Sequence, residues 1–365
     1  MYDVCIVGGG INGVAIAERC GILGLKTILF EKTKLGSGAS SNTSKLAHGG
    51  LRYLEQFQFG LVKEALQERE ALMELYPDVC KPLPFVFPVY DGMFEPKIWF
   101  GLKLYDFLAG KESILPKSKK IPLDQTKVNL PWLDMEKVKA GYVYYDAVMD
   151  DYEILQRTAT AAKQCLVDIF EREMVTHYNK KGSTYEVTTN KRVVNAKLIV
   201  NVTGAWANKF HKDTIVKPSK GIHIVTDSFC DEYASILRAP QDDRVFFTIP
   251  YYGNTIIGTT DTYYDGDLDD VKATYEDVRY ILKAFNHFSI RKIDLNDIVY
   301  TYAGLRPLAN ATKSKLFASS MSRDVEVIEN DNVMTLVGGK YTTHRSVARK
   351  AANLILQRVH SGHQK

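Results

Sequence analysis

The feature that most constrains this chain is a glycine-rich turn between a buried strand and a helix at its start. Residues 2–7 form a short apolar, β-branched run, and residues 11–23 carry apolar side chains at helical spacing. Residues 26–30 (KTILF) then predict a second buried strand. A strand, a helix and a second strand in this order form a βαβ unit, so the chain is predicted to build a parallel sheet.

The turn itself, Gly8-x-Gly10-x-x-Gly13, has the spacing of a dinucleotide-binding fingerprint. The first glycine permits the tight turn, the second lets the backbone approach a pyrophosphate, and the third lets the helix pack against the strand. Glu31 ends the second strand, where a carboxylate accepts from a ribose 2′-hydroxyl and repels a 2′-phosphate. The fingerprint alone does not separate FAD from NAD.

Two further features favour FAD. The run 40–55 (SSNTSKLAHGGLRYLE) is too polar for a core helix and follows the fingerprint closely. Its hydroxyl groups suit the pyrophosphate and ribityl chain of a flavin. A second strand and glycine turn, at residues 202–204, returns later in the chain, where flavoproteins of this kind bring the backbone back to the nucleotide.

Composition excludes several classes of protein. The chain has 365 residues, 45% of them hydrophobic and 25% charged, which is enough for two domains. Its net charge of +4 is spread without a basic block, so nucleic acid is not an expected partner. Five scattered cysteines without zinc spacing predict no metal and fit a reducing cytoplasm. No signal peptide is expected, since residue 2 already opens a strand, and no spanning helix is expected, since no apolar run reaches roughly 20 residues.

Strands and helices alternate along the rest of the chain, and prolines at 82, 84 and 88 interrupt them. We interpret these prolines as a crossing between domains. The predicted fold class is α/β, with a Rossmann-like FAD-binding domain interleaved with a β-sheet-rich substrate domain. The predicted ranges are 1–80, 145–210 and 297–365 for the FAD-binding domain, and 81–144 and 211–296 for the substrate domain.

The segment 98–120 has two interpretations. Its first part, IWFGLKLYDFL, is apolar and aromatic, and four lysines follow between residues 111 and 120. One interpretation is a core helix followed by a solvated loop. The other is an amphipathic patch that rests on a membrane surface, which would make a cytoplasmic protein peripheral to the membrane.

Eight stretches, in order along nearly the whole chain, match one known family. They are GGGINGVAIA at Gly8, SKLAHGGLRYLE at Ser44, LVKEALQERE at Leu61, VTGAWA at Val202, KGIHIV at Lys220, IPYYGNTIIGTTDT at Ile249, DIVYTYAGLRPL at Asp297 and GGKYTTHR at Gly338. In these stretches the chain resembles the FAD-dependent glycerol-3-phosphate dehydrogenases, which are amino-acid-oxidase-like flavoproteins. The resemblance implies oxidation of sn-glycerol 3-phosphate to dihydroxyacetone phosphate, with hydride transfer from C2 to flavin N5.

Phosphate recognition is predicted from arginines. Guanidinium groups bind a phosphate dianion in a forked geometry, and the candidates are Arg52, Arg306 and Arg323. The resemblance implies that Arg306 and Arg323 hold the phosphate and that Arg52 and Tyr53 line the substrate cavity. Thr260 is predicted to present a hydroxyl to the substrate.

Lys340, His223 and Arg306 form the predicted catalytic set. Lys340 precedes a predicted helix, where the dipole disfavours a cation unless an anion binds nearby. Lys340 is therefore predicted to reach the reacting oxygen or the flavin. Two histidines, His223 and His48, are candidates for the base, since neutral imidazole suits proton removal near pH 7.

The predicted cofactor contacts come from the fingerprint, the polar run and the later glycine turns. They are Gly8, Gly10, Asn12, Gly13, Glu31, Lys32, Ser40, Ser41, Thr43, Ser44, Leu46, His48, Val175, Thr203, Gly204, Trp206, Gly304, Gly339, Lys340, Tyr341 and Thr342.

Several alternatives stay open. The family's usual C-terminal helical domain is not expected here, because the last predicted helix ends near residue 358, and this leaves oligomeric state and membrane docking undecided. The electron acceptor is a quinone, molecular oxygen or a soluble carrier. The substrate is alternatively another polyol phosphate or a 2-hydroxy acid. A flavin-binding scaffold without turnover is the non-enzymatic alternative.

Overall fold

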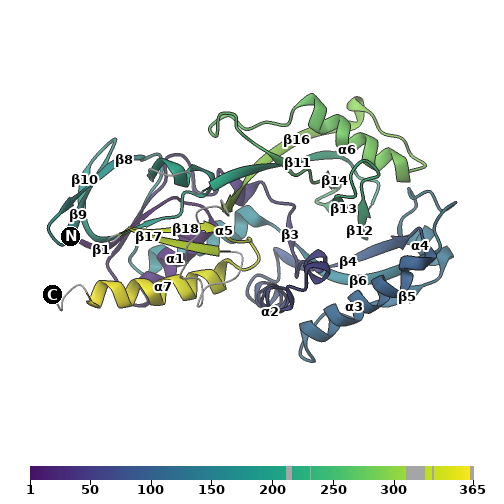
Figure 1. Cartoon of the computed structure of the whole chain (residues 1–365), viewed down its shortest axis with the longest axis horizontal. Helices are drawn as coiled ribbons and strands as arrows, with labels where there is room; N and C mark the ends of the chain where they lie inside the picture. Colours follow the sequence, from purple (N-terminus) through teal and green to yellow (C-terminus); the bar gives the residue numbers. More distant parts are fainter. Residues whose placement is uncertain (211–215, 231, 310–324, 331–332, 362–365) are drawn as a thin grey trace.

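The structure is built on two large sheets that lie side by side along the long axis of the molecule (Figure 1). The computed structural model describes residues 1–210, 216–230, 232–309, 325–330 and 333–361. Helices and strands alternate along the chain, and the predicted α/β fold class is confirmed.

The first sheet contains the predicted βαβ unit. Its strands are β1 (Tyr2–Val7), β2 (Thr27–Phe30), β7 (Asp168–Phe170), β8 (Val175–Lys181), β9 (Thr184–Thr189), β10 (Val193–Asn201), β17 (Val325–Asn330) and β18 (Val333–Gly338). Its main path runs β17-β18-β10-β1-β2-β7, and the five strands from β18 to β7 are parallel. The predicted parallel sheet is confirmed.

Helices cover this sheet and the second one. They are α1 (Ile11–Ile22), α2 (Phe59–Leu75), α3 (Glu95–Ala109), α4 (Leu123–Asn129), α5 (Asp151–Gln164), α6 (Tyr275–Phe288) and α7 (His344–Ser361). Short 3-10 turns are η1 (Ala39–Ser41), η2 (Leu51–Gln56), η3 (Gly92–Phe94), η4 (Gly204–Phe210) and η5 (Leu295–Asp297). α1 packs against α5 and α7, and their apolar faces share one buried core with β1, β2 and β10. This core fixes the direction in which α1 points.

The second sheet is mostly antiparallel. Its strands are β3 (Leu46–Ala47), β4 (Cys80–Val89), β5 (Lys119–Ile121), β6 (Ala140–Met149), β11 (Val216–Asp227), β12 (Ala234–Arg238), β13 (Val245–Tyr251), β14 (Asn254–Gly258), β15 (Thr262–Tyr263) and β16 (Ile298–Ala309). α6 lies on one side of this sheet in the upper lobe of Figure 1, where its apolar face packs onto β11 and β14. Within the described ranges, no helix is both long and apolar enough to cross a membrane.

The prediction that three prolines interrupt the secondary structure is wrong, and the crossing between domains inferred from them stays a prediction. Pro82, Pro84 and Pro88 lie inside β4, which pairs with β6 over its whole length. The three prolines are separated by even numbers of residues. Because the N–H groups of alternate residues point to the same edge of a strand, all three missing N–H groups lie on one edge of β4. The ladder with β6 on the other edge therefore remains continuous.

The predicted domain ranges follow the two sheets only in part. β16 falls in the range 297–365, which was assigned to the FAD-binding domain, yet it pairs along β11 in the second sheet. β3 falls in the predicted range 1–80, yet it pairs with the end of β6 in the second sheet, and β6 itself crosses the predicted boundary at residue 145. The division into two domains stays a prediction.

Gly13 permits the close packing of α1 on β1, and this predicts a strong effect of one methyl group. A Cβ at Gly13 would lie 2.0 Å from the backbone oxygen of Gly8. We expect Gly13→Ala to lower the free energy of unfolding by about 3 kcal/mol, at the upper end of overpacking effects, as measured by denaturant unfolding. The control is Gly101→Ala in α3, where a Cβ meets nothing within 4 Å. That change is expected to stabilise the protein by about 0.5–1 kcal/mol. Equal effects of the two changes would contradict this account.

Candidate active site

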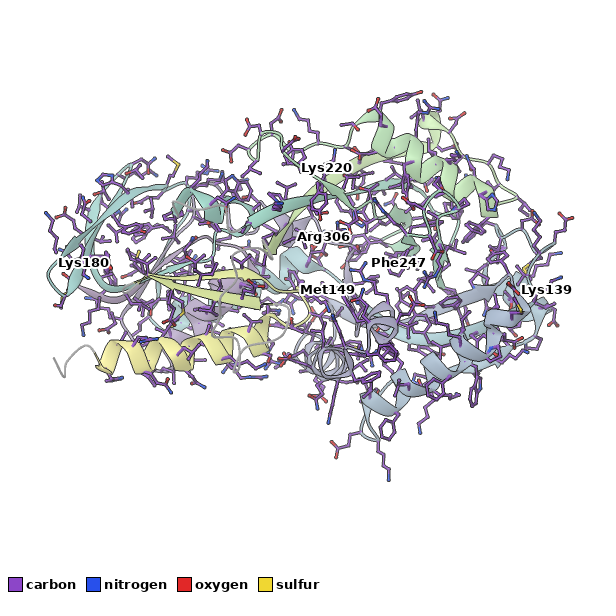
Figure 2. All side chains as sticks on the ribbon, viewed as in Figure 1. Lys139, Met149, Lys180, Lys220, Phe247 and Arg306 are labelled. Carbon is purple, nitrogen blue, oxygen red and sulfur yellow. The ribbon has the colours of Figure 1, made fainter. Side chains whose placement is uncertain are left out.

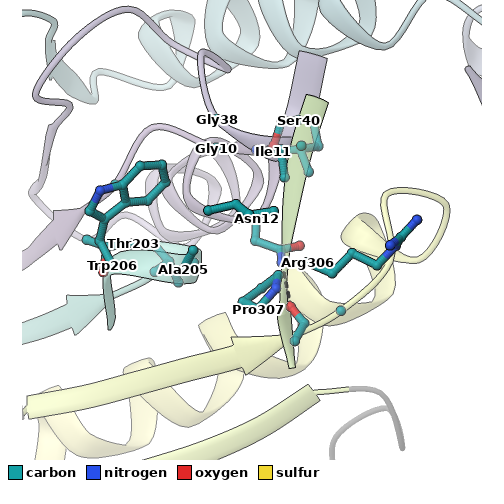
Figure 3. A pocket seen from close by; sticks show the side chains of 18 of the residues that line it. Gly10, Ile11, Asn12, Gly38, Ser40, Thr203, Ala205, Trp206, Arg306 and Pro307 are labelled. Atoms are coloured by element: carbon teal, nitrogen blue, oxygen red, sulfur yellow. Dashed lines mark hydrogen bonds between the residues drawn. The ribbon is translucent and has the colours of Figure 1, made fainter. Parts of the chain in front are cut away.

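One long cavity of about 1200 Å³ runs between the two sheets and past the start of α1. Figure 3 shows Trp206 and Arg306 on opposite sides of Gly10, Ile11 and Asn12 in this cavity. Arg306 also lies near the middle of the molecule in Figure 2. The volume exceeds that of an ordinary small-ligand pocket, so a dinucleotide and a small substrate fit together.

The fingerprint forms one wall of this cavity. Gly8 has φ +113°, a conformation that favours glycine, and a Cβ there would lie 2.7 Å from the Val202 oxygen. Gly10 begins α1 without a side-chain cap, and the Ile11 N–H donates to Ser40 Oγ at 2.9 Å. The positive end of the helix therefore faces the cavity, which suits a pyrophosphate.

A buried polar atom at this wall indicates that a ligand completes it. Among the described residues, Asn12 Oδ1 has no hydrogen-bond partner. A buried polar atom without a partner costs free energy comparable to a lost hydrogen bond. The residues present therefore fit a polar cofactor such as FAD.

Glu31 lies where the fingerprint predicts it. Its Oε2 accepts from the Gly9 N–H at 2.8 Å, and its Oε1 accepts from the Thr33 N–H at 2.8 Å. Oε1 also accepts from the Thr33 hydroxyl at 2.9 Å, so Oε2 is the oxygen that retains a lone pair for a ribose hydroxyl.

Asp269 is a residue that sequence reasoning missed. It comes from the loop between β15 and α6, yet it accepts from Trp206 Nε1 at 2.8 Å and forms an ion pair with Lys32. Lys32 Nζ lies 4.1 Å from the centroid of the Trp206 ring. The second sheet's loop therefore holds two predicted cofactor contacts, which no pattern around Asp269 indicated.

At the other end of the cavity, cations surround an aromatic ring. Lys340 Nζ lies 3.7 Å from the centroid of the Tyr53 ring, and Arg52 Nη2 donates to the Tyr53 hydroxyl at 3.0 Å. Gly339, at φ +91°, leads the chain past Asn12, so a Cβ there would lie 3.0 Å from Asn12 Nδ2. The motif GGKYTTHR thereby brings Lys340 to the polar run.

Arg306 is held in place by the loop that follows β14. Its Nη2 donates to Thr259 Oγ1 at 3.0 Å, and its Nη1 donates to the Thr260 carbonyl oxygen at 3.2 Å. Asp261 forms a longer ion pair with Nη1 at 3.3 Å. The guanidinium group is thus oriented before any ligand binds. Thr260 differs from expectation, because its hydroxyl accepts from the Ile222 N–H and does not line the cavity.

His223 is buried beside this arginine. Its Nε2 and Ser44 Oγ are 2.9 Å apart, and its ring stacks on Tyr302 at a centroid distance of 4.7 Å. Burial, with the charges of Arg306 and Lys45, lowers the pKa of His223 to about 3. The imidazole is therefore neutral at pH 7.

His48 has a similar electrostatic environment. Burial, followed by the charges of Lys340, Arg52 and Arg69, lowers the pKa of His48 to about 3. Two neutral imidazoles thus lie in a field of cations. A bound dianion would oppose that field and raise both pKa values, which is the change that a general base near pH 7 requires.

A buried network supports the turn after His48, and sequence reasoning did not find it. The Gly49 N–H donates to the Tyr105 hydroxyl at 2.8 Å and to Asp146 Oδ1 at 3.2 Å. Arg69 Nη1 donates to the same Asp146 oxygen at 2.8 Å. In the sequence, Arg69 resembles an ordinary arginine on the surface of a helix, so no pattern predicted its burial.

The comparisons with known proteins agree with this geometry. The sequence model of the family described as "FAD dependent oxidoreductase" matches residues 3–352. The chain belongs to the FAD dependent oxidoreductase family. The prediction of FAD rather than NAD is therefore confirmed, as is the prediction of a flavin-dependent oxidoreductase.

Three known proteins are similar to this chain over nearly its whole length. A glycerol-3-phosphate dehydrogenase of Synechocystis is 33% identical over 97% of this chain and 70% of its own length. A D-erythritol 1-phosphate dehydrogenase of Brucella abortus is 33% identical over 95% of this chain and 72% of its own. The glycerol-3-phosphate dehydrogenase of Bacillus halodurans complexed with FAD has a TM-score of 0.76 and 26% identity, covering 98% of this chain. This chain spans 64% of that structure's chain.

Most of the predicted site residues line the one cavity. The lining includes Gly8, Gly10, Asn12, Glu31, Lys32, Ser40, Thr43, Ser44, Leu46, His48, Arg52, Tyr53, Val175, Thr203, Gly204, Trp206, His223, Gly304, Arg306, Gly339, Lys340, Tyr341 and Thr342. Gly13, Ser41 and Thr260 lie behind its wall, and Arg323 lies outside the described residues. The cavity brings the residues together, while the role of each remains a proposal.

Proposed function

We propose that this chain oxidises sn-glycerol 3-phosphate to dihydroxyacetone phosphate with FAD as the hydride acceptor. One observation carries the proposal: Arg52, Arg306 and Lys340 line the same cavity as the dinucleotide fingerprint, next to neutral imidazole. Cations at this position suit a phosphorylated substrate. Relatives named glycerol-3-phosphate dehydrogenase support this choice of substrate.

In the proposed mechanism, the protein binds, orients and deprotonates the substrate. FAD, when bound, accepts the hydride at N5. Arg306 binds the phosphate, because Thr259 and Thr260 already orient its guanidinium group. Lys340 stabilises the negative charge that develops on the C2 oxygen as its proton leaves.

His223 is the proposed base, with His48 as the second candidate. If Nε2–H of His223 donates to Ser44 Oγ, the lone pair is on Nδ1, which has no hydrogen-bond partner among the described residues. The Tyr302 ring stacked on the imidazole keeps this orientation.

The main alternative function is the same oxidation by FAD, acting on a polyol phosphate with a different carbon skeleton. The relative from Brucella abortus is named for D-erythritol 1-phosphate, a longer polyol phosphate. The same cations would bind its phosphate, so the arginines do not discriminate between the two. A scaffold without turnover is less well supported, since a scaffold has no need of Arg306 or Lys340 in the cavity.

The proposed oxidation predicts bleaching of the bound flavin. Anaerobic addition of sn-glycerol 3-phosphate should remove the visible absorbance of the holoenzyme, because hydride transfer reduces FAD. D-erythritol 1-phosphate, a 2-hydroxy acid and glycerol serve as the comparison panel. An unchanged spectrum with sn-glycerol 3-phosphate and bleaching with another member would reassign the substrate. Subsequent mixing with air or with a quinone analogue would show whether oxygen or a quinone reoxidises the flavin.

Arg306→Ala should weaken substrate binding and leave FAD bound. Loss of charge-assisted hydrogen bonds to phosphate costs about 1.5–3 kcal/mol, so the KM should rise roughly 10- to 140-fold. Steady-state kinetics and the ratio of flavin to protein absorbance provide the measurements. Arg238→Ala is the control, since Arg238 pairs with Glu55 outside the cavity. Full substrate affinity in Arg306→Ala would contradict the assigned role.

We further propose a peripheral contact between α3 and a membrane surface. α3 packs through Leu102 and Tyr105, so it contributes to the core through one face only. On its other side, Phe100 and Phe107 are 64% and 78% exposed, and Trp99 is also exposed. Exposed lysines follow within residues 111–120. Exposed aromatics beside lysines suit the interface of an anionic bilayer.

Vesicle flotation tests this contact. The protein should float with vesicles that contain anionic lipid, and Phe100→Ser with Phe107→Ser should abolish flotation, because their rings supply the apolar contact. The matched control replaces Tyr263 and Tyr275 by Ser, since both are exposed elsewhere on the second lobe. Equal flotation of the two double variants would exclude α3 as the contact.

A further inference from the structure

A buried carboxylate outside the predicted site reaches the polar run from α5. Asp151 is the first residue of α5, and its side chain is fully buried. Its Oδ2 accepts from Thr43 Oγ1 at 2.7 Å and from the Thr43 N–H at 3.3 Å. Its Oδ1 accepts from Lys45 Nζ at 2.6 Å. One carboxylate thus binds the residues on both sides of Ser44.

These contacts fix the backbone around Ser44. Lys45 has φ +57°, which L-residues rarely adopt, and its Nζ also donates to the Ser41 carbonyl oxygen at 2.8 Å. Thr43 Oγ1 accepts from the Lys45 N–H at 2.9 Å. The segment 41–45 is therefore closed into a tight loop whose hydrogen bonds converge on Asp151.

Ser44 is the residue that this loop presents to His223. Its Oγ lies 2.9 Å from His223 Nε2. The Tyr302 hydroxyl donates to the Thr43 carbonyl oxygen at 3.0 Å, and the Tyr302 ring stacks on the imidazole. The loop therefore contacts His223 directly through Ser44 and indirectly through Tyr302.

Helix capping does not account for Asp151. The neighbouring Asp150 is the N-cap of α5, and its side chain accepts from the Glu153 N–H at 2.9 Å. Both Asp151 oxygens are used on residues 43 and 45, more than 100 positions earlier in the chain. The two adjacent carboxylates thus have separate tasks.

We propose that Asp151 is a positioning residue: it holds Ser44 so that the Ser44 hydroxyl fixes the orientation and tautomer of His223. Asp151 acts through Thr43 and Lys45 and does not touch the substrate. The inference rests on the proposed function, since it assumes that His223 acts on the substrate hydroxyl.

The first test measures flavin reduction in single turnovers of the holoenzyme with sn-glycerol 3-phosphate. Asp151→Asn and Thr43→Val should each slow reduction by about tenfold or more, as expected when a reacting group is misplaced. Thr43→Val breaks the same contact while keeping the buried ion pair of Asp151 with Lys45, so it remains informative if Asp151→Asn folds poorly. In Asp151→Asn the dissociation constants of FAD and substrate should stay unchanged, because Asp151 does not line the cavity. Asp150→Asn is the control and should reduce at the wild-type rate.

A double variant separates positioning from general damage. If Asp151 acts through Ser44, Asp151→Asn should cause no further slowing in a Ser44→Ala background. If the slowing factors of the two substitutions multiply in the double variant, or if Asp151→Asn reduces its flavin at the wild-type rate, the proposal is wrong.

The second test does not depend on turnover. In holoenzyme labelled with 15N-histidine, the Nε2 and Nδ1 signals of His223 should show the Nε2–H tautomer in wild type and Asp150→Asn. Asp151→Asn, Thr43→Val and Ser44→Ala should move these signals in the same direction. If wild-type flavin is not bleached by the substrate, the proposed function fails, and the signals still decide the role of Asp151. Unchanged signals in Asp151→Asn would refute that role.

Discussion

The contact between Gly13 and the backbone of Gly8 is the constraint on which the site depends. Because nothing larger than a hydrogen fits between them, α1 approaches β1 closely and its start faces the cavity. The core of α1, α5 and α7 then holds this arrangement from the outer side. The polar run, the turn before α7 and the loop after β14 all reach the same cavity from this framework.

Charge distinguishes the two ends of the cavity. At the fingerprint end, a helix start and the Glu31 carboxylate suit a pyrophosphate and a ribose. At the other end, Arg52, Arg306 and Lys340 lie near imidazoles whose pKa values are lowered to about 3. A phosphorylated alcohol would bring its charge to the cations and raise the basicity of the imidazoles. Binding and proton removal are thereby coupled through one electrostatic field.

Sequence patterns predicted the local elements and most of the cavity lining, since both depend on neighbours in the chain. Alternation, glycine spacing and the motif GGKYTTHR each depend on a few adjacent residues. The prolines of β4 were misread because their tolerance depends on which edge of the strand faces a partner. Thr260 was predicted to present its hydroxyl to the substrate. That hydroxyl instead accepts a hydrogen bond from the Ile222 N–H of β11, a contact between segments far apart in the sequence.

By itself, the sequence determined the βαβ start, the dinucleotide fingerprint and the set of arginines, lysine and histidines available for chemistry. It did so because these depend on spacing within short segments. Only the tertiary structure decided which buried carboxylates hold that set in place. The buried Asp146 and Asp151 bond residues 97 and 108 positions away in the chain. A charge becomes a support for a distant loop only when folding removes both from water and brings them within hydrogen-bond distance.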